Sequence, residues 1–282
     1  QAELSAAKAR IIGRIEKAAE RMRKGVLFLE RNQLAREVFT LANRAMLMQM
    51  VHSRFTKCRK GEGVTAEPDY FSEKFSGILW RPFQLAFQLL AIESVLNEES
   101  DDREIVDIIW FPTGGGKTEA YLVLAAMEIF HRRLKHKEKG YGTAVLKRYT
   151  LRLLTSQQFE RASRLICACE TIRQDRPELG AEPISLGLWV GEGSSPNAYT
   201  KATGTGGALE KHKEALEAEK PEIFFSLTAC PWCGTSIYPE SYDVDDCYGV
   251  KATETSFKIF CPEEKCAFHD EIPVNVVDEH LY

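Results

Sequence analysis

A glycine-rich run at residues 111–118, Phe-Pro-Thr-Gly-Gly-Gly-Lys-Thr, carries the clearest chemistry in this sequence. It stands between a predicted strand at residues 104–110 and a predicted helix at residues 117–134. Glycines let a backbone turn tightly and bring its N–H groups against phosphate oxygens, and a helix N-terminus adds N–H donors and a positive dipole end. We therefore predict a phosphate-binding loop. The residues expected around the phosphates are Thr113, Gly114, Gly115, Gly116, Lys117 and Thr118.

Two side chains of this loop have predicted roles with ATP. The Lys117 ammonium is expected to contact the β- and γ-phosphates, and the Thr118 hydroxyl to bind Mg²⁺. The general pattern GxxxxGK[ST] has glycine at the position of Phe111, so the match is incomplete. A glycine-rich hairpin before Lys-Thr is the alternative interpretation, and the flanking strand and helix favour the phosphate loop.

Residues 112–117 resemble motif I of superfamily 2 helicases, most closely in the form found in RecQ-type enzymes. Upstream, residues 81–84, Arg-Pro-Phe-Gln, are similar to the Q-motif of that superfamily. The resemblance implies that Gln84 recognises adenine, and a glutamine amide can pair a donor and an acceptor with that base.

Residues around position 152 are similar to motif Ia, which holds the backbone of single-stranded DNA. An amphipathic helix with a surface arginine would give the same pattern, so that alternative stays open. The resemblance implies DNA contacts from Arg148, Thr150, Arg152 and Gln157.

A closer resemblance is to the helicase subunits of the DISARM phage-defence system. It implies an ATP-dependent DNA helicase or translocase whose N-terminal part, including the first RecA-like domain, corresponds to this chain. It also implies a partner subunit of the same defence system. The segments that carry the resemblance are residues 39–46, 81–87, 111–122, 148–162 and 187–191.

The last residues, 274–282, read VNVVDEHLY and resemble a strand that ends in acidic residues. The family's acidic box places one residue between Glu and His, whereas here His280 follows Glu279 directly. We therefore expect the catalytic acids beyond Tyr282 and keep Asp278 and Glu279 as the alternative. Because the resemblance also implies a second RecA-like domain beyond this chain, the chain alone is expected to be inactive.

Eight cysteines without a secretion signal favour reduced thiols or a metal over disulfides. Two pairs, spaced CxxC and CxxxxC, predict a zinc ribbon, because four thiolates complete a tetrahedral Zn²⁺ site. Cys247 and His269 are possible substitute ligands, and four reduced cysteines without metal are the alternative. Cys167 and Cys169 lie in an apolar helical stretch and are expected to be buried. The predicted ligands are Cys230, Cys233, Cys261 and Cys266.

Periodicity predicts helices at residues 2–55, 117–134 and 151–174, and strands at 104–110, 143–146 and 184–190. Strands alternating with helices indicate an α/β fold with a parallel sheet flanked by helices, and the resemblance implies that this is a RecA-like P-loop sheet. The predicted organisation is a basic helical region at 1–60, a loop at 61–77, the RecA-like ATP-binding domain at 78–220, a zinc-ribbon insertion at 221–271 and a return to the core at 272–282.

Composition indicates a packed globular chain, with 44% hydrophobic and 28% charged residues among 282. No apolar run reaches the roughly 20 residues of a membrane span, and no signal peptide follows Gln1, so we expect a cytoplasmic protein without membrane contact. The net charge is −4, yet residues 1–60 hold 14 Lys and Arg against 5 Asp and Glu. A second basic run spans residues 132–152. Basic stretches attract nucleic acid or form solvated helix faces.

Two other functions remain open at this stage. A P-loop phosphotransferase would turn over nucleotide without DNA and would leave Gln84 and Arg152 unexplained. A non-catalytic zinc-containing scaffold would bind DNA and use its nucleotide site for regulation or not at all.

Overall fold

The computed structural model describes residues 2–58, 67–112, 114–149, 152–190, 194–200, 206–218, 222–238 and 248–281. These residues form two compact units, each built from separate stretches of chain. The first unit comprises residues 1–46, 77–147 and 176–181, and the second comprises residues 47–76, 148–175 and 182–282.

The helical prediction for residues 2–55 is confirmed, with two helices in place of one. Helix α1 spans Ala2–Arg31 and α2 spans Gln33–Cys58. The break falls at Asn32, whose Oδ1 accepts the backbone N–H of Ala35 at 3.0 Å. Asparagine is a favoured N-cap because its side chain satisfies a donor that the new helix leaves unpaired. The side chain at residue 32 thus explains where α2 begins.

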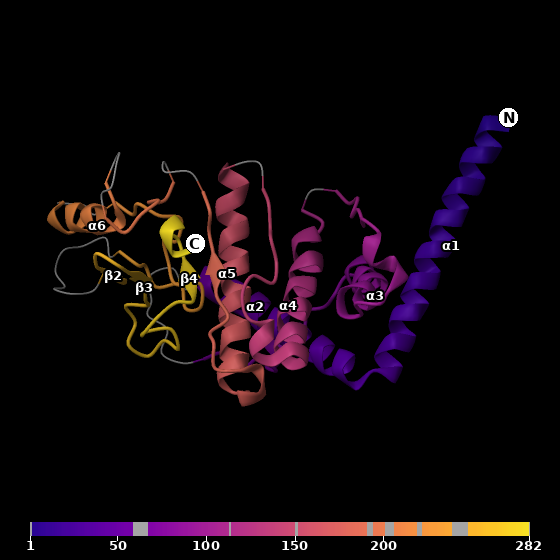
Figure 1. Ribbon diagram of the computed structural model, residues 1–282, viewed down its shortest axis with the longest axis horizontal. Helices are drawn as coiled ribbons and strands as arrows, with labels where there is room; N and C mark the ends of the chain where they lie inside the picture. Colours follow the sequence, from indigo (N-terminus) through magenta and orange to yellow (C-terminus); the bar gives the residue numbers. More distant parts are fainter. Residues whose placement is uncertain are drawn as a thin grey trace. The chain divides into compact units, whose positions relative to one another are not determined.

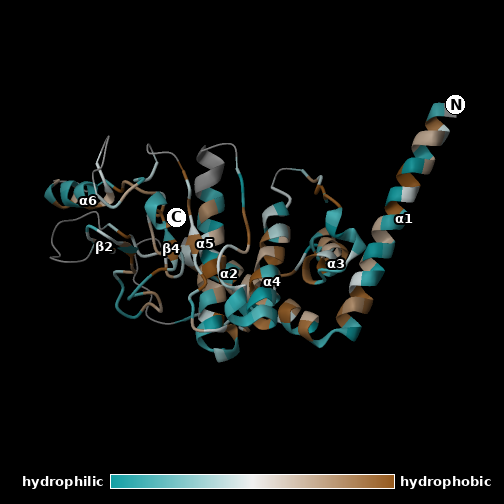
Figure 2. Ribbon diagram, in the orientation of Figure 1, coloured by the Kyte–Doolittle hydropathy of each residue, from teal (hydrophilic) through white to brown (hydrophobic). Residues whose placement is uncertain are grey.

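In the first unit, α1 packs closely against α3, Pro82–Leu96. Figure 1 shows α1 as one long helix, and Figure 2 shows hydrophobic residues over much of α3. The two backbones meet at Gly25, where an added Cβ would lie 1.9 Å from the carbonyl oxygen of Leu89. Arg21 of α1 also donates two hydrogen bonds to Asp107, at 2.6 and 2.9 Å. Helix α1 therefore braces both α3 and the segment that leads into the glycine loop.

Replacing Gly25 by alanine is expected to lower the free energy of unfolding by about 1–3 kcal/mol, the usual cost of overpacking. The clash is with backbone, which cannot rotate away. Gly13 of the same helix is the control, because its added Cβ meets nothing within 4 Å. Gly13→Ala should instead stabilise by about 0.5–1 kcal/mol through helix propensity. Urea unfolding of both variants checks the pair, and equal effects would contradict the close packing.

Helix α4, Lys117–His136, confirms the helix predicted after the glycine loop. Part of the basic run at its end is used locally. Arg132 donates to the carbonyl oxygens of Gly140 and Tyr141, and the Arg133 guanidinium lies 4.3 Å from the centre of the Tyr141 ring. These contacts hold the turn η3, Lys137–Gly140, against α4. The positive charges of Arg132 and Arg133 therefore help to stabilise the local fold.

The expected parallel sheet is present only in part, and the strand predictions for residues 104–110 and 143–146 are wrong for this structure. Residues 101–104 form the short helix η2, Asp101–Glu104, and neither predicted segment belongs to a described ladder. Val106, Ile108 and Trp110 expose 86%, 79% and 92% of their surface. The alternating apolar pattern gives strand propensity, but a strand also needs a partner backbone for its N–H and C=O groups. No described residue supplies that partner.

The second unit is built on α5, Arg152–Gln174, which confirms the third predicted helix. A two-stranded parallel sheet pairs β1, Leu186–Gly187, with β4, Val274–Asn275. A two-stranded antiparallel ribbon pairs β2, Val250–Ala252, with β3, Phe257–Ile259. The remaining elements are the helix α6, Ala208–Glu217, and the single turns η1, Glu73–Phe75, η4, Pro177–Leu179 (in the first unit), and η5, Asp278–Leu281. The unit is thus a mixed helix and strand structure. Among the helices of the described residues, none combines the length and the apolar character that a membrane crossing requires.

Candidate functional sites

The glycine loop leads into α4 through a tight turn that only glycine tolerates well. Gly114 and Gly116 have φ angles of 79° and 90°, in the left-handed region. Gly115 donates its N–H to the carbonyl of Pro112 at 3.1 Å, and a Cβ on Gly115 would lie 2.8 Å from the Phe111 ring. The predicted residue Thr113 lies outside the described residues. The local conformation therefore accounts for three consecutive glycines.

Lys117 and Thr118 open α4 directly after this turn. The Lys117 Nζ donates to the carbonyl oxygens of Phe111 at 2.5 Å and Pro112 at 3.1 Å, which draws the ammonium over the loop. Thr118 is buried, and its Oγ1 accepts the hydroxyl of Tyr121 at 3.2 Å. With the first backbone N–H groups of α4, which have no partner within the helix, these side chains form a compact cationic and donor-rich end. Such an arrangement can bind an anion.

The start of α3 is fastened to the same loop by three contacts. Gln84 is buried, its Oε1 accepts the backbone N–H of Arg81 at 2.8 Å, and its Nε2 donates to the carbonyl of Gly116 at 2.7 Å. The Arg81 guanidinium donates to the carbonyl of Gly115 at 2.7 Å. The Phe83 ring stacks on Phe111 with centroids 4.0 Å apart and planes 16° from parallel. The structure thus brings Gln84 to the glycine loop.

Sequence reasoning missed the contacts of Arg81, Phe83 and Phe111. The available signal was the aromatic residue at position 111, where the general loop pattern has glycine. A phenylalanine next to a glycine-rich turn is expected to pack against another apolar side chain, and the structure shows that this side chain is Phe83.

The predicted DNA-contacting residues belong to the second unit. Arg148 and Gln157 are exposed. Thr150 lies outside the described residues, and so does the side chain of Arg152, although α5 begins at that residue. The structure therefore does not test the prediction that these residues bind a DNA strand.

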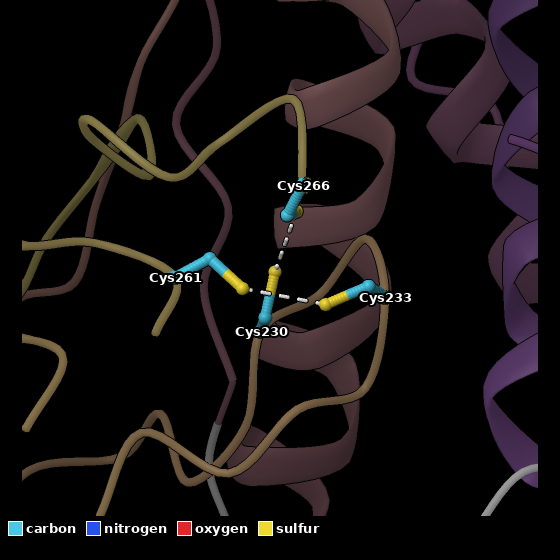
Figure 3. Close-up of side chains that lie close together, drawn as sticks. All are labelled: Cys230, Cys233, Cys261 and Cys266. Carbon is cyan, nitrogen blue, oxygen red and sulfur yellow. Dashed lines mark hydrogen bonds between the residues drawn. The ribbon is translucent and has the colours of Figure 1, made fainter. Parts of the chain in front are cut away.

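Four thiols converge in the second unit to form the cysteine cluster, defined as Cys230, Cys233, Cys261 and Cys266. All four Sγ atoms lie within 4.8 Å of one another. Figure 3 shows the four side chains pointing toward one another. The Sγ atoms of Cys230 and Cys266 are 3.8 Å apart, and those of Cys233 and Cys261 are 3.3 Å apart. Tetrahedral Zn²⁺ with Zn–S bonds of about 2.3 Å needs sulfur atoms about 3.8 Å apart. The cluster can hold a metal ion such as zinc.

Two short turns position the thiols in this cluster. In the first, Cys230 donates its N–H to Thr235 O at 2.8 Å, and Gly234, with a φ of 85°, donates to Cys230 O at 2.9 Å. In the second, Cys261 donates its N–H to Phe268 O at 2.9 Å. The Nδ1 of His269 lies 2.8 Å from the carbonyl oxygen of Cys261. His269, a possible substitute ligand, is therefore not part of the cysteine cluster. Cys247 lies outside the described residues.

The thiols of the cysteine cluster differ in how readily they lose a proton. Burial raises the pKa of the Cys230 thiol, because a thiolate is poorly solvated in the interior. Hydrogen bonds from the neighbouring thiols lower the pKa of Cys233 well below its usual range. The surroundings therefore favour a thiolate at Cys233, and thiolates are the form that binds zinc. Cys167 and Cys169 are buried in α5 as predicted, and burial raises the pKa of both.

Asp278 and Glu279 stand just after β4, in η5. Glu279 Oε2 accepts the backbone N–H of Tyr199 at 2.7 Å, and the Tyr199 hydroxyl lies 2.8 Å from His280 Nδ1. Asp278 is buried, and its Oδ1 has no hydrogen-bond partner among the described residues. Burial raises the pKa of this carboxyl group. The two acids thus lie at the carboxyl end of a parallel strand, where α/β sheets place ligand-binding groups.

Comparison with known proteins gives one clear similarity. No family model matches the chain. Over 281 residues, 97% of its length, the chain is 39% identical to the DISARM protein DrmA of Bacillus paralicheniformis. The chain resembles DrmA along almost its whole length. It covers 24% of that relative, so the DrmA-like sequence described here spans about a quarter of the length of DrmA, and the similarity extends over both units.

Proposed function

We propose that this chain forms the ATP-binding part of a superfamily 2 DNA helicase or translocase that acts in DISARM-like defence against phage. The observation that carries the proposal is the glycine loop at the start of α4, held by Gln84 and Arg81. The similarity to DrmA supports the link to phage defence. In this proposal the first unit contributes the phosphate loop of a RecA-like domain.

ATP would bind with its phosphates against the glycine loop. The backbone N–H groups of Gly114 and Gly116 are the expected donors, and Gly115 would join them by giving up its hydrogen bond to the Pro112 carbonyl. Lys117 would neutralise phosphate charge in place of its present contacts with loop carbonyls. Thr118 would supply a hydroxyl ligand to Mg²⁺. When bound, Mg²⁺ would neutralise charge that develops on the transferred phosphoryl group.

Gln84 remains our candidate for recognition of adenine. In the structure its Oε1 and its Nε2 each make one hydrogen bond within the chain. A glutamine amide offers two N–H donors and two acceptor lone pairs, so one of each is left for a base. The same side chain would then connect the base to the phosphate loop through Gly116 O.

The sequence offers two positions for the catalytic acids. Acids beyond Tyr282 remain the expectation, and Asp278 with Glu279 remains the alternative. The unpaired Oδ1 of Asp278 favours the alternative, since a buried carboxylate oxygen without a donor fits a cation or its bound water. In that role Asp278 would hold Mg²⁺ and Glu279 would activate the attacking water.

DNA would be held through its backbone by Arg148, Thr150, Arg152 and Gln157. Phosphate contacts of this kind are independent of sequence and weaken with salt. Because the similar motif Ia holds the backbone of single-stranded DNA, we propose a single strand or a single-stranded end as the substrate. A partner subunit of the same defence system would act with this protein.

The cysteine cluster would hold one Zn²⁺ as a structural ion, because its four sulfur ligands leave no open position for catalysis.

The test is steady-state ATP hydrolysis by the full-length protein with and without single-stranded DNA. We expect DNA to stimulate hydrolysis, because strand binding and nucleotide turnover are coupled in a translocase. Hydrolysis that DNA leaves unchanged would contradict the motor and indicate a phosphotransferase. A folded protein that binds DNA but never hydrolyses ATP would indicate a scaffold.

A further inference from the structure

A buried histidine of α2, His52, lies against the first turn of the cysteine cluster. Its ring stacks on the Trp232 indole, with centroids 3.5 Å apart and planes 24° from parallel. Its Nδ1 is 2.7 Å from the Trp232 carbonyl oxygen, and its Nε2 is 2.8 Å from the Tyr70 hydroxyl. All three residues belong to the second unit. His52 therefore contacts both the backbone and the side chain of one residue.

The partners of His52 decide which of its nitrogens carries the proton. Burial lowers the pKa of His52 to about 4, so the ring is neutral near pH 7 and has one N–H. The Trp232 carbonyl can only accept, so the proton belongs on Nδ1. Nε2 is then an acceptor, and the Tyr70 hydroxyl donates to it. This fixed tautomer resembles the way that a supporting group orients residues around a metal.

Trp232 is the third residue of the Cys230-Pro-Trp-Cys233 turn, so holding its backbone fixes the geometry between two of the thiols. Its indole also meets the Phe268 ring edge-on at 5.5 Å. Phe268 O accepts the N–H of Cys261, in the second cysteine turn. The contacts thus run from His52 through Trp232 and Phe268 to the opposite pair of ligands.

We propose that His52 is a positioning residue for the cysteine cluster, raising its affinity for zinc by holding the Trp232 carbonyl and indole. In this role His52 would not be a zinc ligand, because the four thiols of the cysteine cluster complete the site. It acts by limiting the conformations of the Cys230–Cys233 turn, so that the thiolates are prearranged before metal binds. The inference rests on the zinc assignment proposed above.

The experiment measures the zinc dissociation constant by competition with a chromophoric chelator, for the wild-type chain and four variants. His52→Leu removes both hydrogen bonds and the ring, and we expect it to weaken zinc binding by about 10- to 100-fold. His52→Asn retains an N–H near the place of Nδ1 and should stay within a few-fold of wild type. Tyr70→Phe, which removes the donor to Nε2, should fall between the two.

His52→Gln is the matched control for a folding defect. Asparagine and glutamine share the amide group, but glutamine places its N–H near Nε2, away from Trp232 O. A general loss of packing would affect both variants alike, whereas positioning predicts that only His52→Gln loses affinity. Equal zinc affinity for these two variants would overturn the proposal. If the wild-type chain binds no zinc, the metal assignment itself fails, and this outcome is distinct from variants that bind as wild type does.

Discussion

Replacement of Lys117 by alanine is expected to reduce ATP hydrolysis by the full-length protein by at least about 100-fold, the usual scale for loss of one charged or donor group at a reacting centre. The fold should survive, because the hydrogen bonds that the Lys117 ammonium makes to described residues go to the carbonyls of Phe111 and Pro112 in its own loop. Phe111 and Pro112 are exposed residues, so we expect water to solvate their carbonyls once the lysine is gone. Steady-state hydrolysis and circular dichroism of the variant check both parts.

Lys213→Ala is a suitable control, because this lysine is exposed on α6 and lies far along the chain from the glycine loop. It should hydrolyse ATP at the wild-type rate. A well-folded Lys117→Ala protein that keeps full activity would show that the glycine loop does not bind the phosphates. The bend at Gly114 and Gly116 would then serve only to connect the segment before it to α4.

The helices and the cysteine cluster were accessible from the sequence, because their signals are local. Helix α4 begins where the glycines end, and the spacing of Cys230 and Cys233 is itself a turn that brings two thiols together. Pairing of the two cysteine turns is long-range, yet it could be predicted because a tetrahedral thiolate site needs four ligands. The need for four ligands thus predicted a contact between two turns that are far apart in the sequence.

The strands could not be predicted by the same reasoning. Residues 104–110 have the composition of a strand, but pairing depends on a partner that composition does not specify. In the second unit, by contrast, β1 pairs with β4, which lies nearly ninety residues further along the chain, and Leu186 is opposite Val274.

The role of His52 could not be predicted for a related reason. A lone histidine on an apolar helix face gives no sign of its partner, and only the fold shows that this partner is Trp232.

Loss of two ligands from the cysteine cluster has the largest expected effect on the second unit. We expect the wild-type chain to contain about one zinc ion, and the double variant Cys230→Ser, Cys233→Ser to contain almost none, because two ligands cannot hold Zn²⁺ against water. The ribbon around the site has only two strands of three residues each, so its own backbone pairing is marginal. Metal binding in such a small structure contributes directly to folding.

The double variant should therefore also lose cooperative unfolding of the second unit, measured by calorimetry next to metal analysis of freshly purified protein. Cys169→Ala is the control, because that thiol is buried in α5 and lies outside the cysteine cluster. It should keep its zinc and lose only the small packing energy of one sulfur atom. If the double variant unfolds like wild type and the wild-type protein holds no metal, the four thiols are reduced core cysteines. Their convergence would then come from the backbone hydrogen bonds of the two cysteine turns and the packing of Trp232 against Phe268.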